Sequence, residues 1–322
     1  MPIMPATAEA IERAAQALRA GRLVAFPTET VYGLGADATN GAAVADIFAA
    51  KQRPRFNPLI VHVPDLAAAD RLAMLGKIEQ KLAEAFWPGG LTLVLKKRPG
   101  CPVADLTTSG LDTIAIRVPS HPLATTLLRA TARPVAAPSA NRSGHVSPTR
   151  AEHVQADLGD RVAIVLDGGP TGIGLESTIV AVMTDRVALL RPGAVTAEAI
   201  EKVIGETLVR SAASSSTPIA PGQLPSHYAP RAAVRLNARQ VKAGEALLAF
   251  GPQTPAPAGP VVNLSPSGDL REAAANLFSA LRTLDATGVA TIAVMPIPCN
   301  GLGEAINDRL ERAAAPRPAE AG

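Results

Sequence analysis

The feature that most constrains the fold is a repeated alternation of short apolar runs with helical stretches along the chain. Apolar runs of β-strand type, such as those at 22–26, 58–63 and 91–96, are separated by segments with helical periodicity, such as 41–51 and 66–75. Three further runs between 161 and 193 follow one another without a helix between them. This pattern predicts an α/β fold with a twisted mixed sheet over residues 1–210.

A change of composition at residue 211 divides the chain. Residues 211–231 are rich in Ser, Pro and Ala and have no hydrophobic period, which predicts a linker. Residues 232–322 again alternate strand and helix patterns, which predicts a smaller Rossmann-like parallel α/β domain. Its longest helix is expected to begin after Asp269 as the N-cap, with Glu272 in the position of a capping box.

Composition argues against several classes of protein. The net charge is +3 and aromatic residues make up 3% of the chain, so neither a strongly basic domain nor an aromatic platform for single-stranded nucleic acid is expected. Cys101 and Cys299 stand alone without a metal-ligand spacing, so no metal site is expected, and lone thiols favour a reducing compartment. No apolar run reaches membrane-spanning length, and a cytoplasmic location is expected.

The stretch Lys51–Val63, "KQRPRFNPLIVHV", places three cations beside an expected strand, in which His62 alternates with Val61 and Val63 and is expected to point to the other face. Lys51, Arg53 and Arg55 lie within five positions, and prolines stiffen the loop between them and the strand. A solvated charged loop is the common explanation for such a run. The rigidity of the loop and the mutual repulsion of its cations weaken that explanation, and a phosphate site is the competing interpretation.

Four further stretches combine glycines or short polar side chains near expected strand ends, where α/β folds place ligands. They are Phe26–Asp37, Pro138–Pro148, Asp167–Thr178 and Leu190–Val195. Their hydroxyl, amide and guanidinium groups can contact phosphate or ribose oxygens, and their glycines allow close backbone approach. Each stretch alone is equally compatible with an ordinary turn or helix cap. No Ser-His-Asp order, HExxH motif or paired carboxylates point to a dedicated side-chain base.

Together these pieces resemble the threonylcarbamoyl-AMP synthase family, in its two-domain form with a YrdC-like catalytic domain. The matching stretches, in the family's order, are "PTETVYGLGADA", "KQRPRFNPLIVHV", "WPGGLTLVLK", "IAIRVPSHP", "APSANRSGHVSPT", "GGPTGIGLESTIV", "LRPGAVT" and "PGQLPSHYAPR". They span Pro27 to Arg231, and eight in order form a specific signal. The remaining residues agree only in length and α/β pattern. Departures lie at Ser226, where relatives often carry a basic residue, and after Gly222, where a Met is expected.

The resemblance implies a reaction in which L-threonine, bicarbonate and ATP yield threonylcarbamoyl-AMP and pyrophosphate, with Mg²⁺ carried by ATP oxygens. The product would pass to a tRNA threonylcarbamoyl-transferase system that makes threonylcarbamoyladenosine. The alternative is a double-stranded RNA-binding module of the YrdC type, but the near-neutral charge predicts that direct RNA binding is weak or absent. A carbamoyl-transfer maturase is a second rival, and it would be expected to carry CxxC pairs, which this chain lacks.

The resemblance also implies roles for individual residues. The catalytic group at the ATP phosphates would be Lys51, Arg53, Ser139 and Asn141. Further ATP contacts would come from Asn57, Thr113, Ser147, Arg191 and Tyr228. The threonine pocket would consist of Thr30, His62, Arg117, Ser177 and the backbone of Ala137. The linker would act as a lid that closes over the nucleotide, with Tyr228 touching it, because a mixed anhydride must be kept from water.

Overall fold

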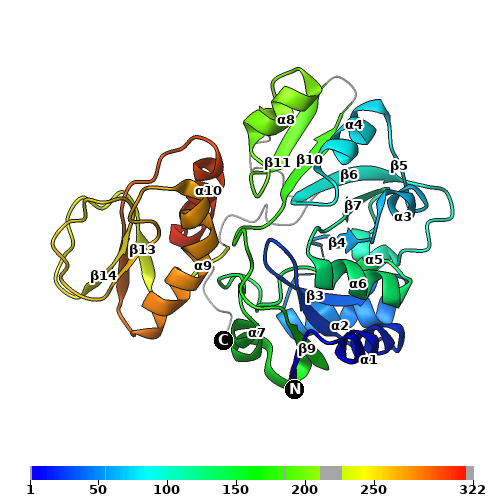
Figure 1. The fold of residues 1–322 in the computed structure, drawn as a ribbon, viewed down its shortest axis with the longest axis horizontal. Helices are drawn as coiled ribbons and strands as arrows, with labels where there is room; N and C mark the ends of the chain where they lie inside the picture. Colours follow the sequence, from blue (N-terminus) through cyan, green and yellow to red (C-terminus); the bar gives the residue numbers. More distant parts are fainter. Residues whose placement is uncertain (1, 55, 184–185, 211–226, 317–322) are drawn as a thin grey trace.

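The computed structural model describes residues 2–54, 56–183, 186–210 and 227–316, which form a large and a small sheet with their helices (Figure 1). The large sheet has twelve strands, in the order β1-β9-β2-β3-β8-β4-β7-β6-β10-β11-β12, with β5 paired to β6. Its strands are β1 (Ile3–Pro5), β2 (Val24–Pro27), β3 (Tyr32–Asp37), β4 (Ile60–His62), β5 (Ala73–Met74), β6 (Leu91–Lys97), β7 (Thr113–Arg117), β8 (Val135–Ala136), β9 (Ile164–Asp167), β10 (Thr178–Val182), β11 (Val187–Arg191) and β12 (Val209–Arg210). Parallel pairs such as β4–β7 and antiparallel pairs such as β6–β7 occur together, so the predicted mixed sheet is confirmed.

The helices of the large sheet cover apolar faces that the sequence pattern provides. They are α1 (Ala8–Arg19), α2 (Gly41–Lys51), α3 (Leu66–Asp70), α4 (Lys77–Phe86), α5 (Asp105–Thr108), α6 (Pro122–Thr131), α7 (Ala151–Leu158), the 3₁₀ turn η1 (Gly159–Arg161) and α8 (Ala197–Ile204). Helices α1 and α6 pack together over one apolar cluster that includes Leu18, Phe26 and Leu127. A larger cluster holds α2 and α4 against the inner strands. Thr7 and Asn40 cap α1 and α2 by accepting hydrogen bonds from backbone amides.

The small sheet is parallel throughout, as predicted. Its strands are β13 (Ala233–Arg235), β14 (Glu245–Ala249), β15 (Val261–Asn263) and β16 (Thr291–Val294), in the order β13-β16-β14-β15, and its helices are α9 (Leu270–Ala286) and α10 (Leu302–Ala314). Asp269 caps α9 by accepting from the amides of Arg271 and Glu272. The expected capping box does not form, because the Glu272 carboxylate accepts from Ser265 at 2.5 Å. The Ser265 hydroxyl in turn accepts from the Asp269 amide.

Two segments differ from their expected structure because of pairing between distant strands. Within Phe26–Asp37 only a short turn is a loop, and the part from Tyr32 onward is strand β3. Gly35 there packs against a neighbour, since a Cβ atom at this position would lie 2.8 Å from the Phe26 ring. The helical pattern expected around 66–75 ends at Asp70, and Ala73–Met74 instead pairs with β6.

The small sheet lies beside the large one with helices α9 and α10 between them (Figure 1). A second apolar cluster joins the two parts and contains Val31, Val146 and Leu175 together with side chains of α9 and α10, such as Phe278. Ion pairs also cross the interface, among them Arg282–Asp157 at 2.6 Å. In the described part of the chain, no helix combines the length and apolarity that crossing a membrane requires.

Candidate active site

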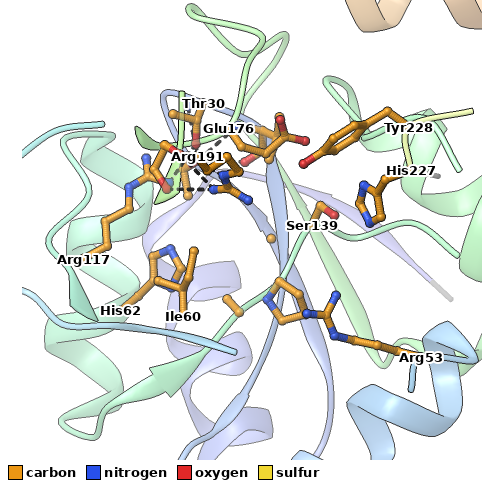
Figure 2. A pocket seen from close by; sticks show the side chains of 16 residues that line it. Thr30, Arg53, Ile60, His62, Arg117, Ser139, Glu176, Arg191, His227 and Tyr228 are labelled. Carbon is orange, nitrogen blue, oxygen red and sulfur yellow. Dashed lines mark hydrogen bonds between the residues drawn. The ribbon is translucent and has the colours of Figure 1, made fainter. Parts of the chain in front are cut away.

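A cavity of about 50 Å³ lies in the large sheet where β2, β4, β7 and β11 end and β10 begins (Figure 2). Nine of the predicted site residues line it: Thr30, Arg53, His62, Arg117, Ala137, Ser139, Ser177, Arg191 and Tyr228. Pockets for small-molecule ligands usually measure roughly 300 Å³ or more. The cavity in this structure is therefore smaller than a typical ligand pocket, and His227 and Tyr228 are among the residues that line it.

Arg117 forms one end of this cavity, which we call the Arg117 end. Its side chain is 4% exposed and donates to the Thr30 hydroxyl at 2.8 Å, to the Glu29 carboxylate at 2.7 Å and to the Gly89 carbonyl at 3.2 Å. Burial raises the pKa of the Glu29 carboxyl, but the charge of Arg117 together with the hydrogen bonds from Arg117 and from backbone amides outweighs it and leaves the pKa below its usual value. The guanidinium fork thus already holds one carboxylate.

His62 lies beside Arg117, because β4 and β7 pair these two residues in register. The neighbours Val61 and Val63 enter the apolar core, so His62 points to the opposite face, as the alternation predicted. Burial and the charge of Arg117 lower the pKa of His62 to about 3, which leaves the imidazole neutral at pH 7. Its Nδ1 atom is buried and has no hydrogen-bond partner among the described residues.

The other end of the cavity, which we call the Lys51 end, is lined by Arg53, and Lys51 lies next to the lining, bonded to the carbonyl of the lining residue Ser139. Lys51 is 1% exposed and Arg53 8%, so the solvated-loop explanation is wrong for both, and Arg55 lies outside the described residues. The Lys51 ammonium donates to the backbone carbonyls of Ser139 and Asn141 at 2.6 and 2.5 Å. Lys51 therefore shapes the turn that carries these two residues.

The two cations at the Lys51 end, Lys51 and Arg53, are not paired with carboxylates among the described residues. Burial and the charge of Arg53 lower the pKa of Lys51, and burial lowers the pKa of Arg53 to about 10. Arg53 donates only to the carbonyls of Asn57 and Pro58, at 3.3 and 3.1 Å. Neither Lys51 nor Arg53 has a carboxylate within ion-pair distance in the described ranges. Such a site favours an anionic ligand.

Five predicted residues lie outside the cavity lining: Lys51, Asn57, Thr113, Asn141 and Ser147. The amide of Asn141 donates to the carbonyls of Arg142 and His145, and the Ser147 hydroxyl donates to Glu176 at 2.5 Å. Both polar atoms of the Asn57 amide are buried without a partner among the described residues. Thr113 begins β7, the strand whose other end carries Arg117.

Arg191 and Tyr228 approach the cavity from different parts of the chain. Arg191 donates to the Ser177 carbonyl at 2.9 Å and to its hydroxyl at 3.1 Å, and that hydroxyl also bonds Thr92. Tyr228 is buried, and Figure 2 shows its hydroxyl directed into the cavity. This hydroxyl has no partner in the described part of the chain, and burial raises its pKa.

Seven residues of the cavity lining were not among the predicted site residues, and three of them have polar or charged side chains, namely Thr28, Glu176 and His227. Thr28 and Glu176 lie inside the stretches that carry the family resemblance, and His227 directly precedes Tyr228. Their positions in these motifs are the sequence signal that could have identified them as site residues. Burial and the charge of Arg53 lower the pKa of His227 well below its usual value. Among the described residues, no group of three or more His, Cys, Asp or Glu side chains gathers as metal ligands.

Two family models together match most of the chain. One, described as telomere recombination, matches residues 16–193, and the other, described as threonylcarbamoyl-AMP synthase, C-terminal domain, matches residues 195–315. The threonylcarbamoyl-AMP synthase of Bacillus subtilis is 43% identical over 95% of this chain and 93% of its own length. The chain belongs to the threonylcarbamoyl-AMP synthase family.

Further relatives of this family agree in sequence and in structure. The threonylcarbamoyl-AMP synthase of Pyrococcus abyssi is 42% identical over 95% of this chain and 94% of its own length. The crystal structure of P. abyssi Sua5 complexed with L-threonine superposes with a TM-score of 0.88 at 41% identity, covering 94% of each chain. The predicted family, fold class and enzyme class are confirmed, and these threonylcarbamoyl-AMP synthases give no support to the RNA-binding alternative.

Proposed function

We propose that this chain is an L-threonylcarbamoyladenylate synthase, which forms threonylcarbamoyl-AMP and pyrophosphate from L-threonine, bicarbonate and ATP. One observation carries the proposal beyond family membership. One cavity has a carboxylate-binding guanidinium at one end and, at the other, Arg53 with Lys51 next to the lining, two buried cations that lack carboxylate partners in the described part of the chain. The guanidinium suits the carboxylate of an amino acid, and the cations without carboxylate partners suit the phosphates of a nucleoside triphosphate.

The Arg117 end is proposed to bind threonine. The fork of Arg117 would take the substrate carboxylate in the way it now takes that of Glu29, which lies 2.7 Å away. Thr30, Ser177 and the backbone of Ala137 would supply short polar contacts. His62 is neutral and has an unpaired Nδ1, so it can bind the substrate without adding a second cation next to the threonine amine.

The Lys51 end is proposed to bind ATP, with Mg²⁺ entering on the ATP oxygens. The phosphates would lie against Lys51, Arg53, Ser139 and Asn141. The other proposed nucleotide contacts are Asn57, Thr113, Ser147, Arg191 and Tyr228. Support comes from the unpaired amide of Asn57 and the unpaired hydroxyl of Tyr228, both buried, because buried polar atoms normally have partners and these would find them on a ligand.

The chemistry follows from holding the two substrates in one enclosure. Bicarbonate yields carbon dioxide by losing a hydroxide, the neutral threonine amine adds to the carbon dioxide, and the proton that the amine then gives up leaves with the hydroxide as water. An oxygen of the resulting carbamate attacks the α-phosphorus of ATP. The bond from this phosphorus to the bridging oxygen breaks, and pyrophosphate leaves with that oxygen. Such a displacement needs alignment and charge stabilisation, which buried cations and short donors supply without a side-chain nucleophile.

We propose a division into a catalytic domain (1–210), a linker and lid (211–231) and a small α/β domain (232–322). Residues 211–226 of this lid lie outside the described residues, and residues 227–231 support the proposal. His227 and Tyr228 line a cavity that is too small for ATP, so we propose that these residues move when the substrates enter. The product would then pass to a tRNA threonylcarbamoyl-transferase system in the cytoplasm.

One incubation tests the proposal. The protein is given ATP, Mg²⁺, L-threonine and labelled bicarbonate, and the products are separated to look for a labelled adenylate and for pyrophosphate. We expect both products, each dependent on threonine and on bicarbonate. Equal pyrophosphate release without threonine would contradict the proposal, and so would tight duplex RNA binding that weakens steeply with salt in a protein that makes no adenylate.

A further inference from the structure

The small domain places one arginine among residues of the large sheet. Arg309, on α10, is fully buried. Its Nε donates to Glu176 at 2.7 Å and its Nη2 to the Pro192 carbonyl at 2.9 Å, while its guanidinium carbon lies 5.0 Å from the centre of the Tyr228 ring. Three segments that are far apart in sequence therefore meet at one side chain.

Each of these three contacts lies next to a residue of the proposed nucleotide subsite. The second oxygen of Glu176 accepts from the Ser147 hydroxyl at 2.5 Å. Pro192 follows Arg191 directly, and Tyr228 lines the cavity itself. The geometry points to a specific role: we propose that Arg309 is a positioning residue by which the small domain holds Ser147, Arg191 and Tyr228 in place for ATP. This inference rests on the proposed function.

The guanidinium is oriented by its own helix. Asp308 accepts from Nη1 of Arg309 at 2.5 Å and from Arg312 at 3.0 Å, so Asp308 is itself held. Arg309 thus presents Nε and Nη2 in a fixed direction, which is what a fork-shaped donor needs in order to hold two acceptors at once. Lysine at position 309 would keep the charge but could not reproduce the three directed hydrogen bonds to Glu176, Pro192 and Asp308.

Joining the two parts of the molecule does not require Arg309 at this position. The interface already contains the shared apolar cluster and the ion pair Arg282–Asp157. A second pair, Arg210–Glu304, also crosses it at 2.7 Å, with side chains that are 57% and 25% exposed and that do not line the cavity. Arg210 therefore offers a matched control: an interdomain Arg–Glu pair without contact to the site.

The test compares Arg309→Lys and Arg309→Gln with Arg210→Gln in the full-length protein. We expect the ATP KM of both Arg309 variants to rise about tenfold, the loss of one to two charge-assisted contacts, while the threonine KM changes less than about twofold. Arg210→Gln should leave both constants unchanged. Equal rises in both KM values, or a lower kcat with unchanged KM values in the folded Arg309→Lys protein, would overturn the inference.

A paired variant separates positioning from folding. Arg309→Gln with Glu176→Gln removes both charges of the buried pair, so that Glu176 is not left as an unpaired carboxylate, and the melting temperature should recover relative to Arg309→Gln alone. Its ATP KM should stay raised, because the contacts to Pro192 and Tyr228 are still altered. Recovery of both properties together would show that Arg309 only stabilises the fold. If the wild-type protein makes no adenylate, the ATP dissociation constants of the wild-type and variant proteins are compared by direct titration. Failure of the proposed function can therefore be distinguished from failure of this inference.

Discussion

The two ends of the cavity differ in how their cations are paired. At the Arg117 end, the guanidinium already has a carboxylate and a hydroxyl as partners, from Glu29 and Thr30. At the Lys51 end, the ammonium and the guanidinium of Arg53 donate to uncharged oxygens. The charge of Arg117 is thus compensated by a carboxylate, whereas Lys51 and Arg53 form buried positive charge that a bound anion would compensate.

The strongest test of this contrast removes one cation from the Lys51 end. Arg53→Ala should lower kcat/KM for ATP by about ten- to a hundredfold, because a charge-assisted contact to phosphate contributes about 1.5–3 kcal/mol. Steady-state pyrophosphate release measures the effect. Arg13→Ala, at an exposed position of α1, is the control and should change nothing. An unaltered kcat/KM in Arg53→Ala would mean that this end does not bind phosphate.

A conservative change sharpens the contrast at the Arg117 end. Arg117→Lys keeps the charge but loses the planar fork, so the threonine KM should rise by about tenfold while the ATP KM stays nearly constant. The two constants are measured in the same assay, each with the other substrate saturating. A rise in the ATP KM with no change for threonine would reverse the assignment of the two ends.

The Lys51 end should also respond to pH in a defined direction. Burial and Arg53 lower the pKa of Lys51 in the free protein, and bound phosphate would raise it again, so ATP binding should take up a proton. Affinity should therefore fall several-fold as pH rises, and by at most about tenfold per pH unit for one proton. Calorimetric titration in buffers of different ionisation enthalpy measures the uptake.

Two variants check this pH response. In Lys51→Arg the replacement side chain stays charged, so the proton uptake should disappear. Lys96→Arg, at an exposed position of β6, should retain the uptake. Release of a proton by the wild-type protein on ATP binding would contradict the sign derived from the buried ammonium.

The smallest expected effect concerns Tyr228, which lines the cavity. Tyr228→Phe removes a buried hydroxyl that has no partner among the described residues, so stability without ligand should stay constant or rise by up to about 1 kcal/mol. The ATP KM should rise about threefold if that hydroxyl meets the nucleotide. Thermal unfolding without ATP and the KM together give the test. Lower ligand-free stability with an unchanged KM would assign Tyr228 a packing role.

Much of the fold and of the site was predictable because the signals are local. Period-two and helical patterns predicted most strands and helices, and the alternation around Val61 and Val63 predicted the side to which His62 points. The pairing of Ala73–Met74 with β6 was not predictable, because the helical pattern of that segment is overridden by a strand elsewhere in the chain. Gly35 was interpreted as a residue that allows close approach of a ligand, but it packs against the Phe26 ring. This contact also depends on the pairing of strands and not on the local pattern.

The sequence by itself determined the alternating α/β pattern, the cap at Asp269 and the family to which the site residues belong, since each depends on neighbours along the chain. Only the tertiary structure decided that Glu29 pairs with Arg117 and that Arg309 reaches Glu176, contacts between residues 88 and 133 positions apart. Such contacts form when packed sheets and helices exclude water and leave buried charges to find partners. That condition depends on the arrangement of the elements in space and cannot be read from any one segment.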